Sequence, residues 1–531
     1  MPDLSTADHR VSPPVLDIPR CYNAAHDLIE RNLQAGRKDK PAFIDDTGIY
    51  TYADVAHNTS ACANLLQKMG VVAEQRILLC LHDTIDFPTV FLGAIKAGIV
   101  PIPVNTLLTQ GDYEYMLTDS AAKIAVVSAA LLPLFLPLLG KVPTLERILV
   151  AGSEHMPDGL SVLLKEASGD FESLATSRDA PCFWLYSSGS TGAPKGTVHV
   201  HSSLIQTAEL YARPILGINE NDVIFSAAKL FFAYGLGNGL TFPMAVGATA
   251  VLMAERPTPM AVMTRLLEHQ ASIFCGVPTL YASMLTNPDL PAREALNLRC
   301  CISAGEALPE EIGKRWSIHF GLDILDGIGS TEILHIFLSN RFGEVRYGTT
   351  GKPVPGYTLR LVDDNDQLVS PGETGELQIF GPTSATLYWN NREKSRHTFL
   401  GGWTRSGDKY RQDEDGYFIY AGRNDDMLKV SGIYVSPIEV ESVLINHPAV
   451  LEAAVVGKED GDKLIKPIAY IVLKPGIETS PELEAELKAH VKACLAPYKY
   501  PRWMKFVDEL PKTATGKIQR YKLRADSACQ P

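Results

Sequence analysis

The chain has 531 residues, with 49 Lys and Arg against 61 Asp and Glu, and its formal net charge is −12 at pH 7. This length exceeds what one hydrophobic core usually serves, so two or more structural units are expected. The negative charge argues against nucleic-acid binding, which relies on Lys and Arg, but leaves small anionic ligands open. Nine scattered cysteines without a CxxC pair favour a reducing, cytoplasmic location.

No secretory or membrane segment is predicted. The N-terminal stretch MPDLSTADHRVSPPVLDIPR has early acidic residues and lacks the apolar core of a signal peptide. The most apolar run, 125–140, is shorter than a membrane span and contains Pro133 and Pro137. We interpret it as a buried strand followed by an interrupted helix, and we expect no association with a membrane.

Strand-like and helix-like patterns alternate through the larger, N-terminal part of the chain. Four segments are typical of buried strands, and 87–105 is typical of a helix that leads into another strand. The four segments are 76–83, 123–128, 147–152 and 248–255. This alternation predicts βαβ units and largely parallel sheets. In 357–381, Asp/Asn and Pro-Gly turns instead predict antiparallel strands.

A second, smaller domain is predicted at the C-terminal end. Segments 449–460 and 466–476 are typical of strands, and 480–501 begins with a Ser cap and a Pro before apolar residues at helical spacing. About 105 residues suffice for a separate α+β domain. The predicted domains are therefore 1–424 and 425–531.

The stretch LYSSGSTGAPKGTVH, 185–199, combines glycines, hydroxyl side chains and one lysine. Glycines let consecutive backbone N–H groups converge on an anion, and hydroxyl groups add hydrogen-bond donors. The hydroxyl-bearing residues are Ser187, Ser188, Ser190 and Thr191. A Walker A loop is excluded, because Pro194 stands where its second glycine belongs and Lys195 is followed by Gly196. An ordinary Gly/Ser surface loop is the alternative for so short a fragment.

The whole stretch resembles the phosphate loop of the adenylate-forming superfamily, which includes acyl-CoA synthetases, adenylation domains and firefly-type luciferases. Further segments resemble the motifs of this superfamily in the same order along the chain. They are GVPTLY (276–281), SAGEALP (303–309), DGIGSTE (326–332), GETGEL (372–377), GGWTRSGD (401–408), 420–441 and PKTATGKIQR (511–520). KLFFAYGLGN and STEILHIFLSN are most similar to benzoate–CoA ligases.

The resemblance implies an α/β fold with a large N-terminal domain of two αβ sheets plus a distorted β-barrel. A small, mobile α+β C-terminal domain would act as a lid and carry Lys517. The implied reaction joins an acid to coenzyme A with ATP and Mg²⁺, through an acyl-adenylate. Lys517 would bridge the carboxylate and the α-phosphate as a catalytic residue. Glu332 would bind Mg²⁺, a hard cation that prefers carboxylate oxygen.

The resemblance also assigns a nucleotide site assembled from several segments. Thr191 and Lys195 would bind the β and γ phosphates, and Asp408 would bind the ribose hydroxyls with help from Arg423. The other expected ATP- and AMP-binding residues are Ser187, Ser188, Gly189, Ser190, Gly192, Ala304, Gly305, Glu306, Asp326, Gly327, Ile328, Gly329, Ser330 and Thr331.

A second half-reaction is implied after pyrophosphate leaves. The small domain would rotate about a hinge at Asp425, and Lys429 would then serve thioester formation, unless it is an ordinary surface charge. The expected coenzyme A path includes Phe232, Ser431 and Gly432, where glycine leaves backbone room. Reversible acetylation of Lys517 by a lysine acetyltransferase and a deacetylase is a further implication, because acetylation removes a charge.

The expected acid-binding pocket includes KLFFAYGLGNG, 229–239. Relatives that activate amino acids have an acidic residue at the position of Ala233, so alanine argues against an amino acid. Small residues beside larger ones indicate a flat, apolar slot that fits an aromatic ring. The expected pocket residues are Phe232, Ala233, Tyr234, Gly235, Ala304, Gly327, Gly329, His335 and Ile336. His335 either packs in the core or reads a ring substituent.

Benzoate is therefore the first candidate substrate, and hydroxybenzoate and aminobenzoate are the alternatives. Such a reaction would belong to the breakdown of aromatic compounds. An adenylation enzyme that loads a carrier protein and a non-catalytic nucleotide sensor are the competing functions. A zinc site at His199 and His201 is not expected, because no third ligand lies near them in the sequence. A monomer and a homodimer both stay open.

Overall fold

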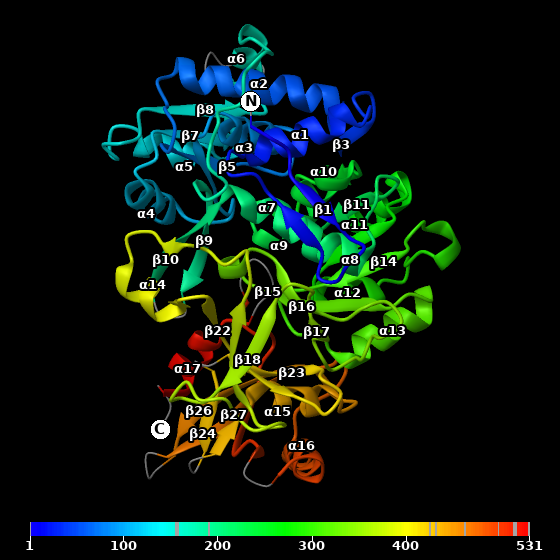
Figure 1. Cartoon of the computed structure of the whole chain (residues 1–531). Helices are drawn as coiled ribbons and strands as arrows, with labels where there is room; N and C mark the ends of the chain where they lie inside the picture. Colours follow the sequence, from blue (N-terminus) through cyan, green and yellow to red (C-terminus); the bar gives the residue numbers. More distant parts are fainter. Residues whose placement is uncertain are drawn as a thin grey trace. The chain divides into compact units, whose positions relative to one another are not determined.

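Two sheets build the larger of the two units into which the chain divides (Figure 1). The computed structural model describes residues 2–153, 159–189, 192–423, 426–430, 433–460, 464–496, 499–512 and 518–528. The larger unit comprises Met1–Leu359 and Ile379–Arg405, and the smaller one Arg360–Gln378 and Ser406–Pro531. The predicted α/β class, with a larger N-terminal and a smaller C-terminal part, is confirmed. The predicted boundary at Asp425 falls outside the described residues and stays a prediction.

The first sheet has nine strands, and its central strands run parallel. Its order is β17 (Lys352–Pro353), β16 (Ile336–Ser339), β15 (Ile324–Gly329), β14 (Cys300–Ser303), β13 (Ile273–Gly276), β11 (Val223–Ser226), β12 (Thr249–Val251), β3 (Pro41–Asp45) and β4 (Gly48–Thr51). β13 and β14 are buried along their whole length, which explains their continuous apolar sequences.

The second sheet has four parallel strands. Its order is β6 (Val100–Pro103), β5 (Arg76–Cys80), β7 (Ile124–Ser128) and β8 (Arg147–Ala151). Together with β12, these strands confirm the sequence-based prediction of buried strands in parallel sheets. The apolar run 125–140 forms most of β7 and three short helical turns. No helix among the described residues is both long and apolar enough to span a membrane.

Helices of the larger unit cover these sheets. They are α1 (Ala24–Gln34), α2 (Tyr52–Lys68), α3 (Asp86–Lys96), α4 (Gln110–Ser120), α5 (Leu132–Phe135), α6 (Leu160–Glu166), α7 (His201–Thr207), α8 (Arg213–Leu216), α9 (Ala233–Leu236), α10 (Phe242–Val246), α11 (Pro259–His269), α12 (Pro278–Leu285), α13 (Glu310–Phe320) and α14 (Arg392–Thr398). Two π-helical segments, η3 (Ala208–Ala212) and η4 (Gly237–Thr241), interrupt them. Leu266, Tyr281 and Trp316 of α11 to α13 pack into one core with Phe274 of β13.

Three further groups of strands follow. β1 (Thr6–Asp8) pairs with β2 (Val15–Asp17), and β10 (Gly192–Val200) lies between β9 (Pro181–Gly189) and β20 (Leu387–Tyr388). A five-stranded sheet contains β18 (Thr358–Val362), β19 (Gly375–Phe380), β22 (Trp403–Gln412), β21 (Phe399–Leu400) and β23 (Phe418–Arg423).

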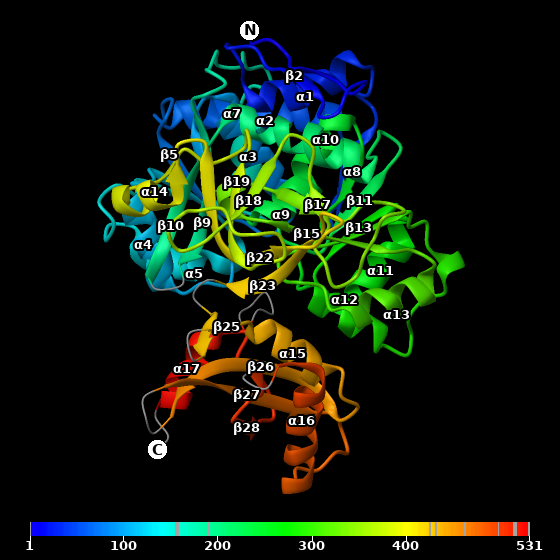
Figure 2. The same ribbon diagram turned by 60° about the horizontal axis from the view of Figure 1, so that its bottom comes forward.

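The smaller unit continues with a three-stranded sheet that has helices on both faces (Figure 2). Its strands are β26 (Val450–Glu459), β27 (Ile465–Leu473) and β28 (Trp503–Phe506), and its helices are α15 (Pro437–Ile445), α16 (Pro481–Cys494) and α17 (Arg520–Ala528); a short pair, β24 (Leu428–Val430) and β25 (Ile433–Val435), precedes them. Val455 packs with α15 and α16, and its neighbour Val456 packs with Leu523 of α17. This alternation follows from the two-residue period of a strand.

A buried ion pair connects α15 to α17 inside the smaller unit. Arg520 donates to both carboxylate oxygens of Glu441, at 2.9 and 2.7 Å, and the backbone N–H of Val455 donates to Glu441 at 2.7 Å. Burial raises the pKa of Glu441, and the Arg520 charge opposes that rise. Arg520 is the last residue of the motif 511–520 and the first of α17, so this pair holds the start of α17 against α15.

We predict that Glu441→Gln lowers the local free energy of unfolding of α17 by about 3 kcal/mol, because it removes the nearest anion from a buried guanidinium and leaves, among the described residues, only Asp426, 3.9 Å away. Glu439→Gln is the matched control, since Glu439 pairs with Lys499 at 2.6 Å but is more exposed; its expected cost is about 0–1 kcal/mol. Hydrogen exchange of the α17 and β26 amides measures both. Equal protection in the two variants would contradict the prediction.

Candidate functional site

The glycine-rich stretch 185–199 folds largely as an antiparallel hairpin of β9 and β10. Gly189 lies opposite Gly192, and Lys195 lies opposite Ser187, with a register shift between these two pairs. The sequence suggested a loop, but β9 extends to Gly189 and β10 begins at Gly192, the last and first described residues on either side of 190–191. Strand pairing therefore brings Lys195 and Ser187 together before any ligand is present.

Glu332 is the residue on which the phosphate-side groups converge. It lies in the short helix η6 (Thr331–Ile333), and its Oε1 accepts a hydrogen bond from the Tyr388 hydroxyl at 2.7 Å and one from Ser187 at 3.4 Å. The Lys195 ammonium lies 3.9 Å from the same oxygen and 4.4 Å from the centre of the Tyr388 ring. A cation, a carboxylate and two hydroxyl groups thus form one cluster.

This cluster fits a magnesium ion and phosphate groups. Carboxylate oxygen is the ligand that Mg²⁺ prefers, and the ion usually bridges a carboxylate and nucleotide phosphates. Among the described residues, the side-chain contacts of Glu332 all go to Oε1. The side chains of Glu332 and Lys195 are each 16% exposed, so both remain reachable by a ligand. Glu332 is the residue that would bind Mg²⁺ here.

Tyr388 is a member of the cluster that the sequence motifs did not single out. It lies in β20, which pairs with β10 so that Tyr388 is opposite Thr197. The only sequence signal would have been an aromatic residue in a short polar segment, LYWNN, far from the glycine-rich stretch. Tertiary pairing of β20 with β10 places its hydroxyl on Glu332.

His199 supports the chain next to Glu332 rather than a metal. Its Nε2–H donates to the carbonyl of Thr331 at 2.7 Å, and its ring stacks on Phe183. Burial lowers the pKa of His199 to about 4, so the imidazole is neutral. The neighbouring His201 accepts from the backbone N–H of Ala24. Both histidine rings thus form hydrogen bonds with backbone groups.

The expected adenine-side residues follow β14 or lie at the carboxyl end of β15, and these two strands are parallel neighbours in the nine-stranded sheet. A Cβ atom at Gly327 would lie 3.0 Å from Ile336 and Leu338, and one at Gly329 would lie 2.7 Å from the His335 backbone. Glycine at 329 is therefore required for the close approach of β15 to β16, and the space at Gly327 is tight. Asp326 is buried, and burial raises its pKa well above the ordinary value.

His335 and three aromatic rings form the core of the expected acid-binding pocket. The His335 ring lies 5.4, 5.8 and 4.5 Å from the rings of Tyr211, Tyr234 and Phe242. Its Nε2–H donates to the carbonyl of Tyr234 at 3.3 Å, and burial lowers the pKa of His335 to about 3. His335 is 2% exposed, and its Nδ1 finds no partner among the described residues. It is thus a neutral, buried acceptor.

Two further residues shape this region: Gly237, inside the stretch 229–239 but not singled out there, and Tyr211, which the sequence motifs missed. A Cβ atom at Gly237 would lie 2.4 Å from the His335 ring, so glycine makes room for the imidazole. Tyr211 comes from the π-helical segment η3, and π-helical turns are frequent at functional sites. Of the predicted pocket residues, Tyr234 is anchored by its hydroxyl, which donates to the carbonyls of Gly276 and Ile302 at 3.2 Å.

In the smaller unit, the expected ribose-binding residues are brought together. Asp408 lies opposite Arg423 in the pairing of β22 with β23, and the guanidinium donates to Asp408 at 3.2 Å. Tyr420, which the sequence motifs did not single out, places its hydroxyl 3.5 Å from the same carboxylate. A buried carboxylate with these neighbours suits the binding of hydroxyl groups.

Several expected residues fall outside the described part of the chain, and their roles stay predictions. They are Ser190, Thr191, Asp425, Ser431, Gly432 and Lys517. Only the backbone is described at Ser188, Gly189, Gly192 and Lys429.

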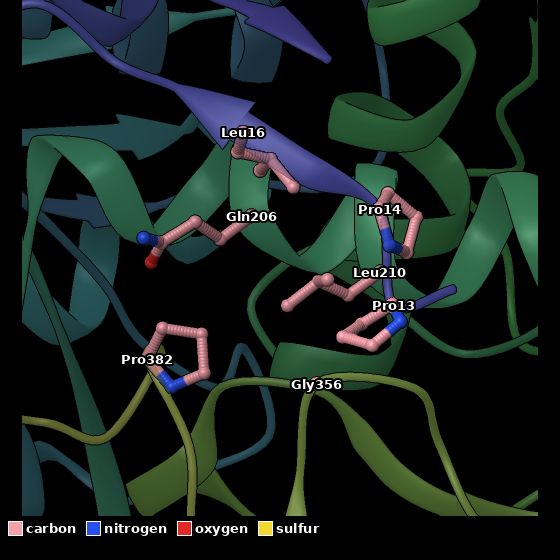
Figure 3. Close-up of a pocket in the computed structure, with 7 residues that line it drawn as sticks. All are labelled: Pro13, Pro14, Leu16, Gln206, Leu210, Gly356 and Pro382. Carbon is pink, nitrogen blue, oxygen red and sulfur yellow. The ribbon is translucent and has the colours of Figure 1, made fainter. Parts of the chain in front are cut away.

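A separate apolar pocket of about 210 Å³ lies beside β2 (Figure 3). It is lined by Pro13, Pro14, Leu16, Gln206, Leu210, Gly356 and Pro382. None of these residues is among the expected site residues, and none carries an ionisable group. We therefore place the candidate site at the Glu332 cluster and the residues around His335.

Known proteins match the chain over nearly its whole length. The family described as AMP-binding enzyme matches residues 29–389, and its C-terminal domain family matches 439–517. A benzoate–CoA ligase of Thauera aromatica is 67% identical, covering 98% of this chain and 99% of its own. A 4-hydroxybenzoate–CoA/benzoate–CoA ligase of Rhodopseudomonas palustris is 49% identical, covering 95% and 94%. Crystal structures of a benzoate CoA ligase from Burkholderia xenovorans LB400 match with a TM-score of 0.88 at 55% identity, covering 95% of this chain and 100% of that one.

We predict that Tyr388→Phe lowers kcat/KM for MgATP by about 10- to 100-fold, because a hydrogen bond to a charged group contributes about 1.5–3 kcal/mol. The measurement is pyrophosphate release at varied ATP and Mg²⁺. Tyr347→Phe is the control, since Tyr347 donates to Asp323 at 2.7 Å, and neither residue belongs to the site. An unchanged kcat/KM for MgATP in Tyr388→Phe would contradict the prediction and show that Glu332 does not need the hydrogen bond from Tyr388.

Proposed function

Because the chain belongs to the AMP-binding enzyme family, we propose that it is an ATP-dependent, AMP-forming benzoate–CoA ligase. Benzoate, ATP and coenzyme A give benzoyl-CoA, AMP and pyrophosphate through benzoyl-adenylate. The full-length similarity to the Thauera aromatica benzoate–CoA ligase carries the proposal. The pocket of aromatic rings around a neutral His335 supports it, because such walls accept an uncharged ring.

The first step joins two anions, so positive charge has to be present where the carboxylate meets the α-phosphate. Lys517 supplies it in this proposal, and Lys195 with Thr191 binds the β and γ phosphates. Mg²⁺ bound by Glu332 would offset phosphate charge. The Tyr388 and Ser187 hydroxyls orient the Glu332 carboxylate through Oε1.

The second step transfers the acyl group from AMP to the thiol of coenzyme A. The carbonyl must then be open to the thiol, which requires Lys517 to leave. In the proposal the C-terminal domain, 425–531, turns about Asp425 and presents Lys429, and the pantetheine arm passes Phe232, Ser431 and Gly432. Acetylation of Lys517 would remove the charge that the first step needs, and so would act as a switch.

4-Hydroxybenzoate is the second candidate substrate, and one observation favours it. The Nδ1 atom of His335 is buried and without a partner among the described residues, so it can accept a hydrogen bond from a ring hydroxyl. The Rhodopseudomonas palustris relative is named for both acids. Benzoate stays the first choice, because the more similar relative is named for benzoate alone.

A cytoplasmic location is part of the proposal. The cysteines that the structure describes are all free thiols, and six of these eight are buried. Free thiols in these numbers suit a reducing compartment.

The decisive experiment is a substrate panel measured by pyrophosphate release and by thioester formation with free coenzyme A. We expect benzoate to give a higher kcat/KM than hydroxy-, amino- and halobenzoates. The kcat/KM for butyrate should be roughly 30- to 100-fold lower than for benzoate. Butyrate buries less apolar surface, which costs about 2–3 kcal/mol of binding free energy. A maximum at 4-hydroxybenzoate would select the second candidate. Release without benzoyl-CoA would favour a carrier-loading enzyme, and no release with any aryl acid would reject the function.

We further predict that Lys517→Ala reduces adenylate formation by about 100- to 1,000-fold, the usual effect of removing a group that stabilises developing charge. Thioester formation from supplied benzoyl-adenylate should be largely spared. Lys429→Ala is the matched variant and should show the reverse pattern. Single-turnover measurements of the two half-reactions separate them. Similar losses in both half-reactions for either variant would contradict the division of labour between these lysines.

A further inference from the structure

The segment Ala227–Leu236, here called the gate segment, follows β11, includes α9 and carries Phe232, Ala233 and Tyr234. It folds tightly on itself: the N–H of Phe232 donates to the carbonyl of Lys229 at 3.0 Å, and that of Leu236 to Phe232 at 2.8 Å. A Cβ atom at Gly235 would lie 2.1 Å from the Lys229 carbonyl. A shift at Lys229 would therefore displace the pocket residues that follow it.

Asp83 attaches the gate segment to the four-stranded sheet. It comes three residues after the end of β5, is 4% exposed, and both of its carboxylate oxygens accept from the backbone N–H of Leu230, at 3.2 and 3.3 Å. Burying a carboxylate is costly unless it is paired with a cation and hydrogen-bonded. This cost points to a role that an apolar residue would not perform.

Lys229 attaches the same segment to the nine-stranded sheet. Its ammonium group donates to the carbonyls of Met253, Ala254 and Glu255, which follow β12, with 2.6 Å to Glu255. Burial raises the pKa of Asp83 to about 6, and the positive charge of Lys229 partly offsets this rise. His82, which precedes Asp83, is half-buried, and its pKa is lowered by burial and by the charge of Lys229. Burial likewise lowers the pKa of Lys229, and the negative charge of Asp83 opposes that fall.

We propose that Asp83 and Lys229 are positioning residues that clamp the gate segment between the two sheets and thereby set the position of the acid-binding pocket. The assignment of that pocket to benzoate rests on the proposed function. Neither side chain is required to touch the substrate. Asp83 acts through the N–H of Leu230, and Lys229 through carbonyl groups beyond β12. Charge-assisted hydrogen bonds to backbone suit this role, because they fix a chain more firmly than neutral ones.

The test is Asp83→Asn in the full-length protein, with Asp86→Asn as the matched control. Asp86 begins α3 nearby, and burial with the charge of Asp45 likewise raises its pKa to about 6. Hydrogen exchange of a peptide covering 227–236 should be about tenfold faster in Asp83→Asn and unchanged in Asp86→Asn. KM for benzoate should rise about tenfold in Asp83→Asn, with KM for ATP unchanged.

Lys229→Met provides a second variant should Asp83→Asn fail to fold, and it should give the same pattern. The double variant should cost less than the sum of the two, because it removes both charges together. The clamp is overturned if exchange in 227–236 is unchanged, if Asp86→Asn behaves alike, or if KM for benzoate and for ATP rise equally. If the wild-type protein does not act on benzoate, the proposed function fails, and the exchange experiment still decides the clamp.

Discussion

The Lys195 ammonium and the Glu332 carboxylate lie 3.9 Å apart, and strand pairing and hydrogen bonds within the larger unit hold them in this position. The hairpin of β9 and β10 supplies the lysine, and the turn after β15 supplies the glutamate. The Tyr388 hydroxyl orients the carboxylate, while His199 ties the Thr331 carbonyl to β10. Opposite charges at partial exposure attract each other without full cancellation, so each can still bind a charged part of a nucleotide.

Close backbone approach is the second constraint on the site. β15 and β16 pack so tightly that a Cβ atom at Gly329 would overlap the His335 backbone, and one at Gly327 would be in tight contact with Ile336 and Leu338. Gly237 in the same way admits the His335 ring between Tyr234 and Phe242. The glycines thus leave room for the aromatic rings, and these rings form a wall without net charge. A carboxylic acid with an uncharged ring suits such a wall.

Buried charged groups in two places connect elements that are distant in the sequence. Glu441 and Arg520 join α15 to α17, while Asp83 and Lys229 connect one segment to two sheets. Such pairs add little net stability compared with apolar packing, but removing one partner is costly. Their value lies in fixing one arrangement of the chain around groups that take part in binding.

Much was determined by the sequence alone. Strand and helix alternation predicted the parallel sheets, and motifs such as DGIGSTE pointed to Glu332 and its neighbours, because local residue patterns reflect backbone geometry and ligand chemistry. Tyr388, Tyr211, Gly237 and Asp83 could not be found in this way. Their contacts join segments 56 or more residues apart, or depend on a ring that another strand delivers. Only the tertiary structure decides such pairings, since a hydrogen bond or a ring contact depends on distance in space, which the order of residues does not contain.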